Sequence, residues 1–144
     1  MEISGGYLSP HFVTDPAHGE ARLDDPYCLV VEGRLTSMQQ ILPVLEGVAK
    51  SGRSLLLIAE ELEGEALATL IINKIRGTLR CCAVRIVSAN QPASNAIRDL
   101  AAITGAPIVS ASGIEALSLD DLGSAAGAII TADRTTIIGG ALLN

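Results

Sequence analysis

Carboxylates gathered along a short stretch are the first residues in this chain that could do chemistry. They are four glutamates within six residues: Glu60, Glu61, Glu63 and Glu65. Paired carboxylates act as acid and base when their environments drive their pKa values apart. These glutamates lie where a predicted strand meets a predicted helix, and a helix N-terminus favours acidic residues for electrostatic reasons alone. We therefore expect no catalytic site here.

The N-terminal loop contains both histidines of the chain, His11 and His18, with Asp15 between them. Imidazole and carboxylate are ordinary metal ligands, but the sequence identifies no further ligand nearby, so we predict no metal site. Ser9 lies close to His11 but lacks the orienting acid of a catalytic triad. No residue is assigned a catalytic role, and no cofactor is expected in this chain.

Cysteine usage indicates the redox environment. Cys81 and Cys82 are adjacent and Cys28 stands alone, so the number is odd and no Cys-x-x-Cys or Cys/His zinc spacing occurs. Such cysteines are typical of buried, reduced thiols. We therefore expect a reducing compartment and a cytoplasmic location.

Composition limits the class of protein. The chain has 144 residues, 49% of them hydrophobic and 18% charged, with a mean hydropathy of +0.42, which predicts one folded domain and excludes a disordered chain. A net charge of −6, with two lysines and three aromatic residues, argues against nucleic-acid binding. The longest strongly apolar run, Leu55–Ala59, is far shorter than the roughly 18 residues that span a bilayer. We predict neither a nucleic acid nor a membrane as partner.

Strand and helix patterns alternate along the chain, which predicts a single mixed α/β unit. The expected strands are Tyr27–Glu32, Ser54–Ala59, Leu79–Val87 and a hairpin of Gly127–Thr131 with Thr135–Ile138. The expected helices are Ser37 to about Lys50, Gly64–Arg76, Ser94–Thr104 and Ser118–Leu122. The continuous apolar character of Leu55–Ala59 indicates a strand covered on both faces.

Two local features leave alternatives open. Pro43 either kinks the first helix or places its true start at Leu42. The segment around Gly5, Gly6 and Pro10 is expected to be extended or turn, without a helix.

The helix Gly64–Arg76 has more apolar surface than docking to one core requires. Its apolar residues spread over about 240° at 100° per residue, where a stripe of about 100° or somewhat more is usual. They are Ala66, Leu67, Ala68, Leu70, Ile71, Ile72 and Ile75. Because a small chain encloses few helices completely, we expect part of this arc to be exposed, and full burial is the alternative.

Two neighbouring segments could extend such an apolar surface. In the preceding helix the apolar arc covers about 160°, so one edge could lie in the core while Leu42 and Leu45 face outward; an ordinary amphipathic helix is the alternative. Tyr7 and Phe12 either pack on the core as a lid or join an exposed patch. Two parallel apolar helices would form a groove that accepts a helix or an extended strand.

Three segments of the chain resemble the apical domain of GroEL-type (group I) chaperonins. They are Gly6–Phe12, Leu42–Gly52 and Leu56–Asn73, and the similarity extends with gaps over nearly the whole chain, including Leu119–Gly123 and Thr135–Ile138. The resemblance implies a swivelling β/β/α fold, a β-sandwich core flanked by helices. It also implies that residues 1–144 are one apical domain excised from a larger subunit.

The resemblance also implies a function. Such a domain binds non-native polypeptides, and the mobile loop of a co-chaperonin, on an apolar surface, as part of an ATP-driven ring of subunits. By position, the binding residues fall on Tyr7, His11, Phe12, Leu42, Leu45, Leu67, Ile71, Ile72 and Asn73. His11 departs from the family, which usually has tyrosine there.

ATP and Mg²⁺ belong to the family's equatorial domain, and this chain contains no G-x-x-x-x-G-K-[ST] or G-x-G-x-x-G motif. We therefore expect no enzymatic activity from this chain itself. The competing hypothesis is a scaffold domain whose apolar helices form a permanent subunit interface.

Overall fold

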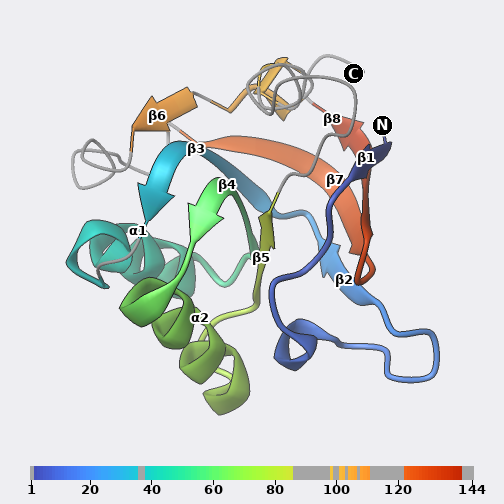
Figure 1. Cartoon of the computed structure of the whole chain (residues 1–144), viewed down its shortest axis with the longest axis horizontal. Helices are drawn as coiled ribbons and strands as arrows, with labels where there is room; N and C mark the ends of the chain where they lie inside the picture. Colours follow the sequence, from blue (N-terminus) through green and yellow to red (C-terminus); the bar gives the residue numbers. More distant parts are fainter. Residues whose placement is uncertain are drawn as a thin grey trace.

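The computed structural model describes residues 2–35, 38–85, 98, 101–102, 104–106, 108–110 and 122–140. Figure 1 shows these parts arranged as a curved sheet with helices packed against one side. In chain order the elements are β1 (Glu2–Ser4), η1 (Pro10–Phe12, a 3-10 turn), β2 (Ala21–Asp24), β3 (Tyr27–Leu35), α1 (Met38–Ser51), β4 (Leu55–Leu62), α2 (Gly64–Arg76), β5 (Cys81–Arg85), β6 (Ile108–Ser110), β7 (Gly123–Ile130) and β8 (Arg134–Gly140).

The sheet has a parallel and an antiparallel part. In the parallel part β4 lies between β3 and β5, and β6 pairs with β3 on its other side. In the antiparallel part β7 pairs with β8 and β2, and β8 in turn pairs with β1. The two parts join where Tyr27 and Cys28 at the start of β3 pair with Ser124 and Gly123 of β7. The described strands therefore form one continuous hydrogen-bonded surface.

Helices α1 and α2 are the crossover connections of the parallel part. Parallel neighbours need a crossover from one end of the sheet to the other, and crossovers of one hand place successive helices on the same face. Accordingly, α1 links β3 to β4, α2 links β4 to β5, and the two helices pack against each other (Figure 1). The topology of the parallel strands thus determines which elements lie side by side.

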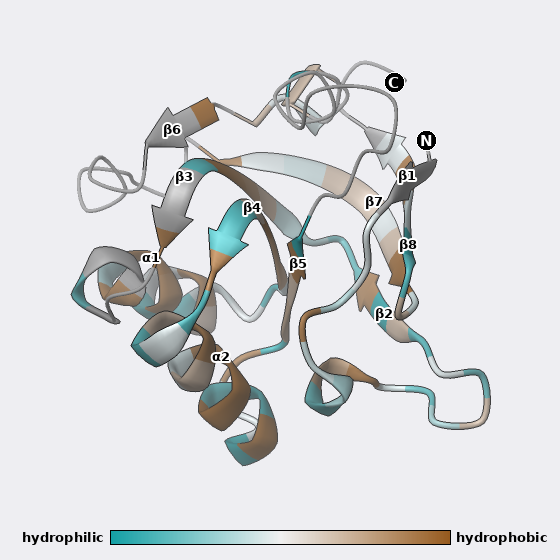
Figure 2. Ribbon diagram, in the orientation of Figure 1, coloured by the Kyte–Doolittle hydropathy of each residue, from teal (hydrophilic) through white to brown (hydrophobic). Residues whose placement is uncertain are grey.

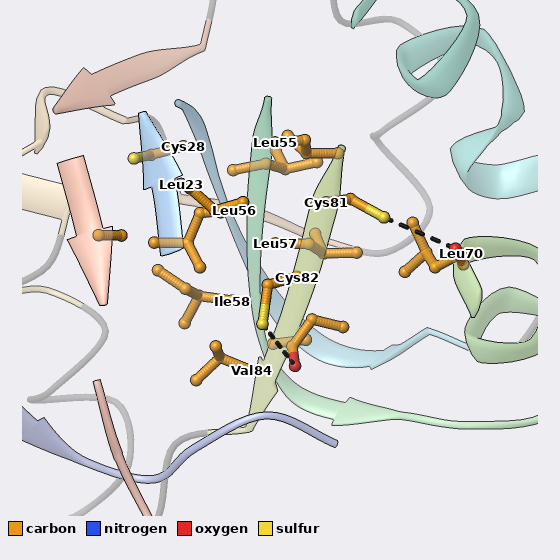
Figure 3. Close-up of a cluster of buried hydrophobic side chains, with 14 of the residues drawn as sticks. Leu23, Cys28, Leu55, Leu56, Leu57, Ile58, Leu70, Cys81, Cys82 and Val84 are labelled. Atoms are coloured by element: carbon orange, nitrogen blue, oxygen red, sulfur yellow. Dashed lines mark hydrogen bonds between the residues drawn. The ribbon is translucent and has the colours of Figure 1, made fainter. Parts of the chain in front are cut away.

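Strand β4 is the centre of the core. All five residues of Leu55–Ala59 are buried to within 1% of complete burial, which confirms the prediction of a strand covered on both faces. Alternate side chains serve opposite sides: Leu57 points toward Leu70 of α2, and Leu56 and Ile58 point to the side of Leu23 from β2 (Figure 3). This double coverage gives the helices a rigid base.

Several expectations are confirmed, including the coarse α/β class. Helix α2 has the predicted bounds, and its end is closed by Gly77 in the left-handed conformation, at φ 75°. Strands β7 and β8 form the predicted antiparallel hairpin. None of the described helices combines the length and apolar character that crossing a bilayer requires.

The helix expected from Ser37 to about Lys50 is confirmed as α1, Met38–Ser51, with Pro43 inside it, so the alternative start at Leu42 is wrong. Another expectation needs correction. The N-terminal segment was expected to contain no helix, yet Pro10–Phe12 forms one 3-10 turn, with the Ser9 hydroxyl accepting a hydrogen bond from the His11 N–H. Most of the expected helix Ser94–Thr104, nearly all of Ser118–Leu122, and the end of the strand Leu79–Val87 lie outside the described residues.

The cysteines are buried and unpaired, as expected: Cys28, Cys81 and Cys82 are all free thiols in the core. Desolvation raises the pKa of the Cys28 thiol to about 12, and the nearby charge of Arg53 acts in the opposite direction. The pKa of Cys81 is likewise raised to about 12 by burial, and burial raises that of Cys82 as well. Because the thiolate is the reactive form, these thiols are protected in the folded state.

We expect the native protein to react with a thiol-specific reagent such as dithiobisnitrobenzoate only at the rate of unfolding. Addition of denaturant should release all three thiols at once, because they share one core. Stopped-flow absorbance at increasing urea concentration measures this. Rapid labelling of any of the three cysteines without denaturant would contradict the burial described here.

Candidate functional site

Helix α2 lies between α1 and the η1 turn, and contacts both (Figure 1). On the η1 side the Lys74 ammonium donates a hydrogen bond of 3.2 Å to the Val13 carbonyl oxygen. The structure therefore brings together the three segments on which the candidate binding residues fall. Whether they form a shared surface depends on the direction in which each side chain points.

Exposure changes steadily around α2. Ala66 and Leu70 are completely buried against the sheet, Leu67 and Ile71 are half-buried, and Ile72 and Ile75 are 47% and 63% exposed. The expectation that part of the apolar arc reaches solvent is confirmed. We define the α2 apolar face as the large apolar side chains of this helix that solvent reaches in part or in full. They are Leu67, Ile71, Ile72 and Ile75. The hydrophobic colouring of α2 in Figure 2 follows this helix to its last turn.

Helix α1 contributes less to this surface than expected. Leu42 is half-buried, which leaves part of it accessible. Leu45 was expected to face outward, but it is only 4% exposed and belongs to the core. An apolar arc of moderate width fits either arrangement, and here the core uses the edge that contains Leu45 together with Val44 and Val48.

The N-terminal aromatic residues act mainly as packing. Phe12 is completely buried, so it serves as the lid on the core and not as part of an exposed patch. Tyr7 is half-buried, and its hydroxyl donates a hydrogen bond of 3.2 Å to the Gly19 carbonyl oxygen. His11 is exposed in the middle of η1, the turn that contacts α2. Of these three residues, His11 is the freest to contact a partner.

Asn73 is occupied at the end of its own helix. Its side-chain amide donates to the Thr69 carbonyl oxygen at 2.8 Å, and its Oδ1 accepts from the Thr78 hydroxyl at 2.9 Å. The Asn73 carbonyl oxygen also accepts the Thr78 N–H at 3.1 Å. Asn73 therefore closes the C-terminal turn of α2, and a partner would have to compete with these bonds to use it.

Ile75 is not among the binding residues that the resemblance implies, although it is the most exposed large apolar side chain among the described residues. The signal was present in the sequence, since Ile75 lies within the wide apolar arc of Gly64–Arg76. The surface therefore extends one turn further along α2 than expected.

The acidic cluster lies where the sequence places it. Glu60 and Glu61 lie near the end of β4, Glu63 precedes the first helical residue, and Glu65 lies in the first turn of α2. This is the position that the helix dipole favours for carboxylates.

A comparison of the chain with models of known protein families gives no match.

Proposed function

We propose that this chain is a polypeptide-binding module that holds exposed apolar segments of non-native proteins against the α2 apolar face. The observation that carries the proposal is the exposure of Ile72 and Ile75 on a helix whose opposite side is completely buried. A contiguous apolar patch kept open on a folded protein usually marks a binding site. The resemblance of Leu56–Asn73 to chaperonin apical domains supports the same choice of partner.

Non-native polypeptide fits this surface better than a single specific ligand. The face consists of leucine and isoleucine side chains, which offer apolar area without directional hydrogen bonds. Each large apolar side chain that a partner buries gains about 1.5–3 kcal/mol, from which the cost of ordering the partner is subtracted. One module should therefore bind weakly, at micromolar concentrations or above, and several modules in a ring would gain avidity.

The finer features of the proposal rest on the resemblance. They are a swivelling β/β/α apical-domain fold, a co-chaperonin mobile loop as second partner, and a ring of full-length subunits in the cytoplasm whose equatorial domains bind ATP and Mg²⁺. The buried, unpaired thiols are compatible with a reducing compartment. In this assignment the chain binds and releases clients, and nucleotide hydrolysis takes place elsewhere in the subunit.

Serine substitutions at the exposed positions test the proposal. Ile72→Ser with Ile75→Ser should weaken binding of a fluorescently labelled, permanently unfolded polypeptide by about ten-fold or more, because two apolar contacts are removed. Fluorescence anisotropy measures the binding. Leu67 and Ile71 are poorer choices because both pack partly on the core, so their loss would also lower stability. Unfolding in urea should show nearly unchanged stability for the double variant.

Ile138→Ser is the matched control. Ile138 is 46% exposed, almost the same as Ile72, but it lies on β8, away from α2 (Figure 1). This variant should bind the unfolded polypeptide as the wild type does. Equal loss in the control and the double variant would contradict a site on α2. A tight dimer in analytical ultracentrifugation that the α2 substitutions dissociate would instead favour a permanent subunit interface.

A further inference from the structure

A closed turn between η1 and β2 brings three potential metal ligands to one place. The Asp15 N–H donates to the Glu20 carbonyl oxygen at 2.9 Å, and the Glu20 N–H donates back to Asp15 at 3.2 Å. The His18 N–H also donates to the Asp15 carbonyl oxygen, at 3.2 Å. These bonds hold Asp15 and Glu20 directly opposite each other, so their side chains project from the same side of the turn.

The side chains converge as the backbone does. His18 Nδ1 lies 2.8 Å from Asp15 Oδ2, and one ligand atom from each of Asp15, His18 and Glu20 lies within 4.8 Å of the others. Tetrahedral bonds of about 2.0–2.2 Å from a central zinc ion place ligand atoms about 3.3–3.6 Å apart. Side-chain rotations that close the widest separation by up to about 1.4 Å therefore bring all three atoms to coordination distance, and the exposed ring of His18 is free to make them.

We propose that this turn binds a divalent transition-metal ion, with Zn²⁺ as the reference, through His18 Nδ1 and one carboxylate oxygen each from Asp15 and Glu20. Water completes the coordination sphere, because the turn is open to solvent. The sequence predicted no metal site because no further ligand could be placed beside His11, Asp15 and His18. The third ligand becomes visible only when the turn closes.

The charges around the turn favour a cation. Asp15 and Glu20 each bring a carboxylate to the turn, and Asp15 Oδ2 is hydrogen-bonded to His18 Nδ1 at 2.8 Å. A metal at Nδ1 replaces the proton shared with Asp15, and the imidazole keeps its proton on Nε2 of the exposed ring. With neutral His18, the two carboxylates outweigh the guanidinium of Arg22 by one negative charge.

Arg22 is the competing cation, and its geometry leaves room for a metal. Its Nη2 and Nε lie 2.8 Å and 3.1 Å from the same oxygen of Glu20, Oε1. The second carboxylate oxygen can therefore approach an ion while the first keeps its contact with Arg22. Because Arg22 is about half exposed, it can also turn away into water. Its positive charge nevertheless opposes metal binding.

Isothermal titration with zinc chloride, at neutral pH in a buffer that does not bind metals, tests the proposal on the full chain. We expect a single saturable site in the wild type. His18→Ala and Glu20→Gln should each weaken binding at least about ten-fold through loss of a ligand. Arg22→Met should strengthen it, by roughly five-fold, since an exposed like charge a few ångström away is removed.

His11→Ala is the matched control, because it removes the other histidine and leaves the turn intact. It should bind zinc as the wild type does. Absence of saturable binding in the wild type would overturn the proposal. So would binding that survives both His18→Ala and Glu20→Gln, or binding that Arg22→Met weakens. The proposal is independent of the α2 apolar face, so its failure leaves the proposed function untouched.

Discussion

Replacing Gly6 with alanine is expected to lower the free energy of unfolding by at least about 3 kcal/mol, at the upper end of what overpacking costs. A Cβ atom at Gly6 would lie 2.0 Å from the Thr131 carbonyl oxygen and 2.4 Å from the Ala132 carbonyl carbon. Both atoms belong to the backbone, so no side-chain rotation relieves the overlap. A loss of this size is a large fraction of the stability of an ordinary domain.

The position of Gly6 explains why the chain cannot move aside. On one side, Tyr7 N–H donates to the Thr131 carbonyl oxygen at 3.1 Å, and Gly5 N–H donates to that of Asp133 at 3.0 Å. On the other, Leu8 N–H donates to the Ala83 carbonyl oxygen of β5 at 3.0 Å. The N-terminal segment is thus bonded to the β7–β8 turn and to β5 together. Relief at Gly6 requires breaking these bonds.

Urea unfolding measured by circular dichroism provides the test, with Gly52→Ala as the matched control. Gly52 has a left-handed φ of 77°, but nothing lies within 4 Å of the added Cβ. This control should cost about 1–2 kcal/mol from backbone conformation alone. A Gly6→Ala variant as stable as the control would show that the N-terminal segment does not pack as closely as described.

The second large effect is expected at Leu70, where alanine should cost about 2–5 kcal/mol. Leu70 is completely buried between α2 and the sheet, and its carbonyl oxygen accepts a weak hydrogen bond from the Cys81 thiol at 3.6 Å (Figure 3). Truncation leaves a cavity that rigid β4 and β5 cannot fill. The same urea titration measures the loss.

Ile75→Ala on the same helix is the control for Leu70→Ala. Ile75 is 63% exposed, so alanine there should change stability by less than about 0.5 kcal/mol. The pair also separates the two sides of α2, since Ile75→Ala should weaken client binding and Leu70→Ala should act through stability. Equal destabilisation by both substitutions would mean that α2 is enclosed on all sides.

Some features of the fold could be predicted because they depend only on residues close together in the sequence. The run Leu55–Ala59 predicted a doubly covered strand because every residue in it is apolar. Gly77 predicted the end of α2 because glycine adopts the left-handed conformation there without strain. The excess width of the apolar arc on α2 predicted that some of it would reach solvent, as Ile75 does.

The remaining features depend on tertiary contacts or on the geometry of a closed turn. Strand β1 has no β-rich pattern and exists because Glu2–Ser4 pairs with β8. A helical wheel gives the width of an apolar arc but not which edge the core takes, so it could not place Leu45. Likewise, Glu20 joins Asp15 and His18 only through the closure of their turn. In each case the deciding information is a partner far along the chain or a turn geometry.

The pairing of β1 with β8 has a consequence for how this unit can be joined to other chains. Glu2 lies opposite Thr136, so the first and last described strands run side by side along one edge of the sheet (Figure 1). Polypeptide can therefore enter and leave through neighbouring points, the arrangement that tolerates grafting into a loop of a host protein. A domain inserted in this way would be joined to its host by two adjacent connections that could act as a hinge. Helix α2 would lie at the end of the domain away from these connections.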